Sequence, residues 1–201
     1  QMCIRDSTND ITKGVTNGLC HWDSRVDRDT GKINDQRLKD YQSSQQAKYM
    51  VNLGNFIKQQ SWSNGEIHVF GFSYGGHTGL WLNSTTVGQP DLFKSVALIW
   101  PFCKMPRRQF QFGNIHTSTR IWATEKDPLS NAGNCHNYYS GDKNLLTLTL
   151  YEGGNHSWFT HPSVTGFSTY WPVWGVQVFH KFDQTLFDKT MSDWKTWIDQ
   201  L

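Results

Sequence analysis

The stretch that decides the fold is "EIHVFGFSYGGHTGL", residues 66–80. Its first residues, Glu66–Phe70, predict a short buried strand, and a helix is predicted to begin just after Ser73 and to run to about Leu82. Between them, residues 71–75 ("GFSYG") fit the pattern G-x-S-x-G. An ordinary turn is one interpretation of this pattern. A strand, this pattern and a helix in direct succession are also the context of a serine exposed on a sharp turn.

The second interpretation gives Ser73 a chemical role. A sharp strand-to-helix turn would hold this serine in a strained backbone conformation, with its hydroxyl exposed at the carboxyl end of the strand. Small residues are expected at Gly71 and Gly75 because the turn brings backbone close, and Gly76 should let the helix lie near the sheet. The helix would direct its first N–H groups at the site. We therefore predict Ser73 as a nucleophile and the backbone N–H of Tyr74 as an oxyanion donor.

A serine nucleophile needs a base, and the base needs a third group that orients it. Among the eight histidines, the best candidate is His156 in "YEGGNHSWF", because it lies in a loop directly after the last predicted strand. Asp127 in "TEKDPLS" follows an earlier strand and is predicted to orient the imidazole. Glu125 is the rival carboxylate, and a turn or capping role is the alternative for Asp127. His77, one helical turn past Ser73, is expected to pack or to line a wall, and His68 alternates within a strand. The remaining histidines, His180 included, have no comparable context.

The rest of the chain indicates the fold class. Apolar runs predict three more strands at residues 95–101, 118–124 and 145–153, and the first of these lacks alternation, as a strand covered on both faces does. Strands alternating with helices favour an α/β fold, with a mostly parallel sheet and helices on both faces. We expect one domain over residues 8–201. Residues 1–7, "QMCIRDS", resemble a translated sequencing-library end and are expected to be an artefact.

Two amphipathic helices are expected in addition to the one after Ser73. The first has apolar side chains three and four residues apart on one face: Tyr49, Leu53, Phe56 and Ile57. The second closes the chain with an apolar stripe that is expected to pack on the core: Phe187, Met191, Trp194, Ile198 and Leu201. A further helix is expected within residues 102–117 or 128–144.

Composition excludes several kinds of partner. The formal net charge is +2, and the densest basic cluster, Lys104, Arg107 and Arg108, is interpreted as a solvated loop, so nucleic acid is not an expected partner. No apolar stretch is long enough to span a bilayer. The acidic run at 27–35 lacks the closing glutamate of a calcium loop, and no cysteine or histidine pair has zinc-ligand spacing. No metal is therefore expected.

The cysteines and the compartment leave alternatives open. Cys103 and Cys135 are the most plausible disulfide pair, and two buried free thiols are the alternative. A cytoplasmic and a secreted location both fit the sequence.

The motifs "GFSYGG", "TEKDPLS" and "EGGNHSWF" together resemble the dienelactone hydrolase branch of the α/β-hydrolase superfamily, over about residues 45–201. The resemblance implies a small-molecule ester substrate and no metal or organic cofactor. The nucleophile of the named enzymes is a cysteine, so Ser73 favours general ester hydrolysis over lactone chemistry. The family also has several strands before the helix at 45–60, one of which precedes the loop that donates a second oxyanion N–H. We find no counterpart, so the domain is expected to be partial.

The sequence thus predicts a serine hydrolase that cleaves carboxylic esters through a covalent acyl-enzyme formed on Ser73. A peptidase or acyltransferase on the same scaffold and a non-catalytic binding domain are the alternatives. Phe72, Trp158 and Phe159 are predicted to line the substrate pocket, and the aromatic stretch at 157–174 is interpreted as a loop or lid. Packing on a flank of the core is the alternative role for these aromatic residues.

Overall fold

The computed structural model describes residues 36–83, 87–101, 103, 115–128, 135, 144–159, 161–171 and 176–201. Its elements follow in the order α2 (Gln36–Lys58), β1 (His68–Phe72), α3 (Tyr74–Leu82), β2 (Ser95–Ile99), β3 (Ser118–Thr124), β4 (Leu146–Tyr151), β5 (Phe167–Trp171), β6 (Val176–His180) and α4 (Gln184–Ile198). The artefact predicted at residues 1–7, the acidic run at 27–35, the cluster Lys104, Arg107 and Arg108, and almost all of the segments predicted to hold a further helix lie outside the described residues.

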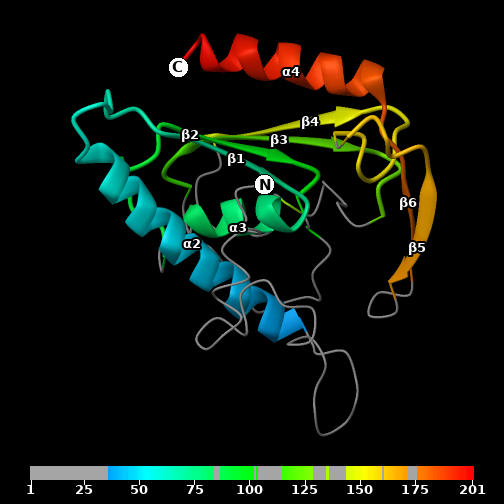
Figure 1. The fold of residues 1–201 in the computed structure, drawn as a ribbon, viewed down its shortest axis with the longest axis horizontal. Helices are drawn as coiled ribbons and strands as arrows, with labels where there is room; N and C mark the ends of the chain where they lie inside the picture. Colours follow the sequence, from blue (N-terminus) through cyan, green and yellow to red (C-terminus); the bar gives the residue numbers. More distant parts are fainter. Residues whose placement is uncertain are drawn as a thin grey trace, which may run out of the picture.

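A four-stranded parallel sheet organises the fold. Its strand order is β1-β2-β3-β4, and the strand ends pair in register, with Phe72 opposite Ile99 and Thr124 opposite Tyr151. Figure 1 shows α4 on one face of this sheet and α2 and α3 on the other. The predicted α/β class, with a parallel sheet covered on both faces, is confirmed.

Two hydrophobic clusters lie on opposite faces of the sheet, and β2 contributes to both. Val96 and Leu98 pack in the cluster under α2 and α3, whereas Ala97 and Ile99 pack in the cluster under α4. Successive side chains of a strand point to opposite faces, so both sets of β2 side chains are buried. This two-sided burial explains why the strand is apolar without alternation.

Helix α2 is confirmed, but the face predicted to pack is partly wrong. Tyr49 and Phe56 are exposed, by 51% and 57%. The helix instead contacts the core through Ala47, Met50 and Gly54, where a Cβ on the glycine would lie only 3.0 Å from Phe93 Cε1. Small residues let the helix approach the sheet closely. The prediction used only large apolar side chains and therefore did not include them.

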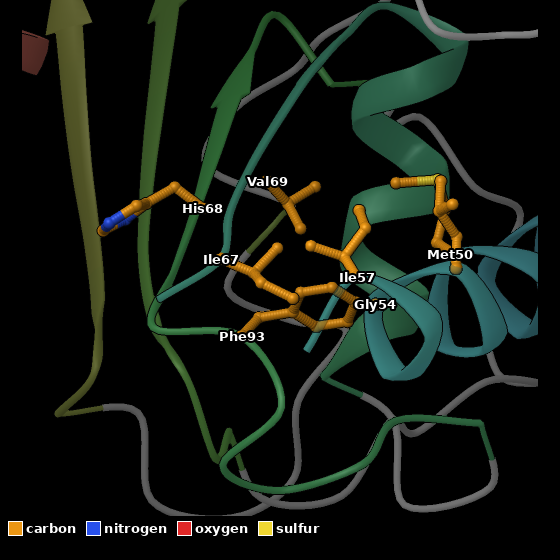
Figure 2. Close-up of a pocket in the computed structure, with 8 residues that line it drawn as sticks. Met50, Gly54, Ile57, Ile67, His68, Val69 and Phe93 are labelled. Carbon is orange, nitrogen blue, oxygen red and sulfur yellow. The ribbon is translucent and has the colours of Figure 1, made fainter. Parts of the chain in front are cut away.

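An apolar pocket of about 90 Å³ lies between α2 and the start of β1. Figure 2 shows Ile57, Ile67, Val69 and Phe93 gathered around it, with His68 pointing away from them. The His68 ring instead hydrogen-bonds the Ser95 hydroxyl at 2.7 Å. This pocket is at the amino end of β1, whereas the predicted nucleophile follows the carboxyl end of the same strand.

The stretch interpreted as a loop or lid contains regular structure, which corrects that prediction. β5 and β6 form an antiparallel two-stranded sheet, with Phe167 opposite His180 and Trp171 opposite Val176. Figure 1 shows this pair of strands at one side of the main sheet. Helix α4 then returns over the main sheet, as predicted, but the predicted stripe is partly wrong: Trp197, outside the stripe, is buried, whereas Leu201 lies beyond the helix and is 40% exposed.

A disulfide joins Cys103, just after β2, to Cys135. Both residues are fully buried. Of the two states that the sequence left open, the structure contains the bridged one.

We expect this disulfide to stabilise the fold by about 3 to 4 kcal/mol, because it closes a loop with a sequence separation of 32 residues. The measurement is urea unfolding of the wild type with and without dithiothreitol. The matched control is the double variant Cys103→Ala, Cys135→Ala. In both buffers it should unfold at a lower urea concentration than the oxidised wild type. Equal midpoints for the oxidised wild type and the double variant would contradict the prediction.

Candidate active site

Three predicted site residues follow the ends of three strands of the same sheet. Ser73 comes directly after β1, Asp127 follows β3, and His156 follows β4. Because the strands are parallel, their carboxyl ends meet at one edge of the sheet, where loops from different strands converge. The topology therefore brings side chains that are distant in sequence to one place.

These three side chains form a continuous chain of hydrogen bonds. The Ser73 Oγ lies 3.1 Å from His156 Nε2, and His156 Nδ1 lies 2.7 Å from Asp127 Oδ2. An ionised carboxylate only accepts, so Nδ1–H donates to Asp127 and Nε2 accepts from the Ser73 hydroxyl. Asp127 and His156 are buried, at 3% and 4% exposure, whereas Ser73 is half-buried. The hydroxyl is thus the accessible end of the chain.

The backbone at Ser73 has the strain that the turn predicts. Its φ is 52° and its ψ is −120°, a region that residues other than glycine rarely adopt. Two hydrogen bonds hold the turn: Ser73 N–H donates to the Ile99 carbonyl at 3.0 Å, and His77 N–H donates to the Ser73 carbonyl at 3.1 Å. The turn is therefore fixed to β2 on one side and to the first turn of α3 on the other.

The two glycines of the pattern have different roles, which corrects the expectation that both must be small. A Cβ on Gly71 would lie 2.6 Å from the Gly75 carbonyl oxygen, so any side chain there would force the turn open. A Cβ on Gly75 would have no described atom within 4 Å. As expected, Gly76 lets the helix lie close, since its Cβ would meet Pro101 Cα at 2.9 Å.

We expect Gly71→Ala to lower the free energy of unfolding by about 1 to 3 kcal/mol, because the methyl group would collide with backbone. The matched variant Gly75→Ala should keep or raise stability by up to about 1 kcal/mol, since alanine is the better helix former. Urea unfolding of both variants measures the difference. Equal losses in the two variants would contradict this account of the turn.

The amino end of α3 points toward the Ser73 turn. Tyr74 is its first residue, so the backbone N–H predicted as an oxyanion donor lies at the positive end of the helix dipole. For the second donor that the resemblance implies, the sequence offers no counterpart, and residues 1–35 lie outside the described residues.

The aromatic residues predicted to line a substrate pocket also take part in packing. Trp158 is fully buried and donates its indole N–H to Thr190 Oγ1 at 3.3 Å, so it belongs to the core cluster under α4. Phe159 is half-buried, with its ring 4.6 Å from that of Phe187. Phe72 is half-buried beside Trp100, at 5.7 Å between ring centroids. Trp158 therefore packs on the flank of the core, which is the alternative role that the sequence left open.

A buried tryptophan lies against the imidazole of the site. The Trp100 ring centroid is 5.6 Å from that of His156 and 4.6 Å from that of Trp158. Trp100 is 1% exposed and has a φ of 34°, so its backbone is also strained where β2 ends. The imidazole therefore rests against a rigid aromatic wall.

His180 is the neighbour of the site that sequence reasoning missed. Its ring is perpendicular to that of His156, with 5.4 Å between the centroids, although β5 lies between these two residues in the sequence. Burial, followed by the charge of His156, lowers the pKa of His180 to about 4, and the negative charge of Asp127 opposes this shift. The only local signal for β6 was the pair Val176 and Val178 on either side of Gln177, and this alternation ends at Phe179.

The depressed pKa of His180 predicts a loss of stability in acid. Between about pH 6.5 and pH 4 the unfolded chain binds a proton at this position while the folded chain does not, so the free energy of unfolding falls as the pH falls. The slope from this one group is at most about 1.4 kcal/mol per pH unit. Burial also lowers the pKa of His116, which acts in the same direction. Urea midpoints at pH 7 and pH 4.5 should therefore differ less for His180→Asn than for the wild type, and equal differences would contradict the prediction.

The described residues offer neither a metal site nor a membrane-spanning helix. They contain no group of three or more histidine, cysteine or acidic side chains placed to hold a metal ion. None of their helices combines the length and the apolar character needed to cross a membrane.

No protein-family model and no curated protein matches the sequence. Among solved structures, the chain is similar to MGS-M1, described as an alpha/beta hydrolase enzyme from a Medee basin deep-sea metagenome library, with 14% sequence identity and a TM-score of 0.47. The similarity covers 80% of this chain and 63% of that one, so the chain spans less than two thirds of that enzyme's length. The function is accordingly argued from the site alone.

Proposed function

We propose that this chain is a serine hydrolase of the α/β-hydrolase superfamily that cleaves carboxylic esters, with site motifs like those of the dienelactone hydrolase branch. Ser73 is the nucleophile, His156 the general base and acid, and Asp127 the group that orients the imidazole. The backbone N–H of Tyr74 is the proposed oxyanion donor.

One observation carries the proposal: a serine on a strained strand-to-helix turn lies at the accessible end of a serine–histidine–aspartate hydrogen-bond chain. The 3.1 Å from Ser73 Oγ to His156 Nε2 and the 2.7 Å from His156 Nδ1 to Asp127 are within reach for proton transfer and orientation. A turn with an ordinary structural role has no need of a buried imidazole and carboxylate aligned behind its hydroxyl.

The reaction proceeds in two halves. Ser73 Oγ attacks the ester carbonyl carbon while His156 Nε2 takes the hydroxyl proton, and the Tyr74 N–H donates to the oxygen that becomes negative. The tetrahedral adduct collapses, the bond to the alcohol oxygen breaks, and the alcohol leaves with the proton from His156. A water molecule then attacks the acyl-enzyme with His156 again as base, which releases the carboxylic acid and restores Ser73.

The buried Asp127 supports this proton cycle. Its carboxylate accepts from His156 Nδ1, so the proton of the neutral imidazole stays on Nδ1 and Nε2 remains free to accept. When His156 takes the serine proton, the adjacent negative charge stabilises the imidazolium.

The experiment that tests the reaction class compares an ester and an amide with the same acyl group. We expect p-nitrophenyl butyrate to be hydrolysed and butyryl p-nitroanilide to be turned over at least about 100-fold more slowly, because an amine is the poorer leaving group. Adding a primary alcohol reveals an acyltransferase if butyryl ester accumulates in place of butyrate. The matched control is Ser73→Ala at the same concentration.

Each outcome has a distinct meaning. Faster turnover of the anilide would replace the ester hydrolase with a peptidase-like enzyme on the same triad. Absence of turnover for every substrate, with a folded protein, would favour a non-catalytic binding domain and contradict the proposal.

A further inference from the structure

We propose that His180 is a positioning residue that holds the His156 ring in line with Ser73, acting through Ser157. This inference rests on the proposed function. It gives a role to a buried histidine that takes no part in the proton cycle described above.

Side-chain hydrogen bonds connect His180 to the His156 loop. His180 Nδ1 lies 2.8 Å from Ser157 Oγ, and Ser157 is the residue directly after His156. The other ring nitrogen, Nε2, lies 2.7 Å from Thr169 Oγ1 on the neighbouring strand β5. His180 is 9% exposed and Ser157 8%, so the contact between them is buried. The ring therefore connects the loop after β4 to the β5–β6 hairpin.

Backbone contacts join the same two segments. His156 and His180 form a parallel β-bridge, and Lys181 N–H donates to the side-chain oxygen of Asn155 at 2.8 Å. Further along, Asp183 N–H donates to the Trp158 carbonyl at 3.2 Å. The end of β6 thus lies beside the His156 loop over several residues. Within this contact, the side chain of His180 hydrogen-bonds the loop at Ser157.

The conformation of Ser157 explains why the loop needs this support. Its φ is 75°, and the glycines before His156, Gly153 and Gly154, have φ values of 72° and 69°. Two glycines make a loop flexible, and a left-handed serine is strained. Without an external contact, this backbone could relax and turn the imidazole away from Ser73. The hydrogen bond from His180 opposes that relaxation.

The neutral state of His180 suits it to this place. With one ring nitrogen donating and the other accepting, a neutral imidazole satisfies both hydroxyl partners, because a hydroxyl can do either. Burial holds the pKa of His180 at about 4, and the titratable groups that act on it are His156 and Asp127. A neutral ring adds no positive charge beside His156, which must itself become positive during the reaction. Phe167 covers the ring, stacked at 4.7 Å between centroids.

Three substitutions at position 180 separate this role from simple packing. His180→Phe keeps a ring that can stack on Phe167 but removes both hydrogen bonds. His180→Asn places an amide where Nδ1 was and can still bond Ser157, whereas His180→Gln places it nearer to Nε2 and Thr169. Thr169→Val is the matched control, since it removes the bond at Nε2 and leaves the bond from Nδ1 to Ser157 in place.

We expect His180→Phe and His180→Gln to lower kcat for p-nitrophenyl butyrate by about 10- to 100-fold, the effect of a misplaced catalytic group, with KM unchanged. For His180→Asn and Thr169→Val, kcat should stay within about 3-fold of the wild-type value, because the imidazole of His156 keeps its place. Ser157→Ala should lower kcat as His180→Phe does, and combining the two should cause no further loss. Should His180→Phe fail to fold by circular dichroism, the comparison of asparagine with glutamine carries the test.

A second readout does not depend on turnover. The His156 Nδ1 proton, bonded to Asp127, should give a far-downfield proton resonance in the wild type and in His180→Asn, and this resonance should broaden or vanish in His180→Phe. Unchanged resonance and kcat in His180→Phe would overturn the positioning role. An inactive wild type whose resonance is still lost in His180→Phe would overturn the ester hydrolase and leave the positioning role supported.

Discussion

Replacing Ser73 with alanine is expected to lower kcat for ester hydrolysis by about 10⁶-fold, the scale seen when a nucleophile is removed from a triad. The acyl-enzyme cannot form without the hydroxyl, and the remaining groups can only assist direct attack by water. The hydroxyl forms a side-chain hydrogen bond with His156 Nε2 at 3.1 Å and does not pack in the core, so its loss should leave the fold intact. Turnover of p-nitrophenyl butyrate, with circular dichroism as the check on folding, measures the effect.

The matched control for Ser73→Ala is Ser168→Ala, at an exposed serine on β5. It removes the same atom from the surface and should leave kcat unchanged. Residual activity of Ser73→Ala above about one hundredth of the wild type would contradict the role of nucleophile, since even the smallest triad effects exceed that loss.

Replacing Asp127 with asparagine is expected to lower kcat by about 10⁴-fold. The amide that replaces the carboxylate can donate to His156 Nδ1, which favours the tautomer with its proton on Nε2. That nitrogen then cannot accept the proton of Ser73. Because asparagine has nearly the same shape, the loss would reflect the proton position more than the packing.

Glu125 supplies the control for Asp127→Asn, because it is the rival carboxylate two positions earlier. It is exposed, whereas the side chain of Asp127 is fully buried against His156. Glu125→Gln should leave kcat within about 2-fold of the wild type, as surface changes away from a site do. A large loss of kcat in Glu125→Gln together with a small loss in Asp127→Asn would assign the orienting role to Glu125 and contradict the account.

Local signals in the sequence were sufficient for the main sheet and for the place of the predicted site residues. A strand buried on both faces is expected to be apolar, and β2, which is buried at every position, is apolar from Val96 to Ile99. The turn at Ser73 requires glycine at position 71 for a steric reason that acts over a few residues. Once the strands are taken as parallel, the residues after their ends must meet, and the structure brings Asp127 and His156 to Ser73.

Long-range packing decided what the sequence could not predict. Tyr49 and Phe56 continue an apolar pattern on α2 yet stay exposed, because the close approach at Gly54 selects another face. The β5–β6 hairpin lies in a stretch rich in aromatic, glycine and proline residues that resembles a loop. His180 lies next to the site because the end of β6 forms a β-bridge with His156, and no local pattern in the sequence encodes this contact.

The most direct test of the central claim is covalent labelling with a fluorophosphonate, followed by mass spectrometry of the digested protein. The reagent phosphonylates a serine only where a base withdraws the hydroxyl proton, so it reports the activated nucleophile without knowledge of the substrate. We predict one adduct per chain, on Ser73, that is absent from Ser73→Ala and forms far more slowly in Asp127→Asn. A folded wild type that remains unlabelled, or an adduct that persists in Ser73→Ala, would contradict the assignment.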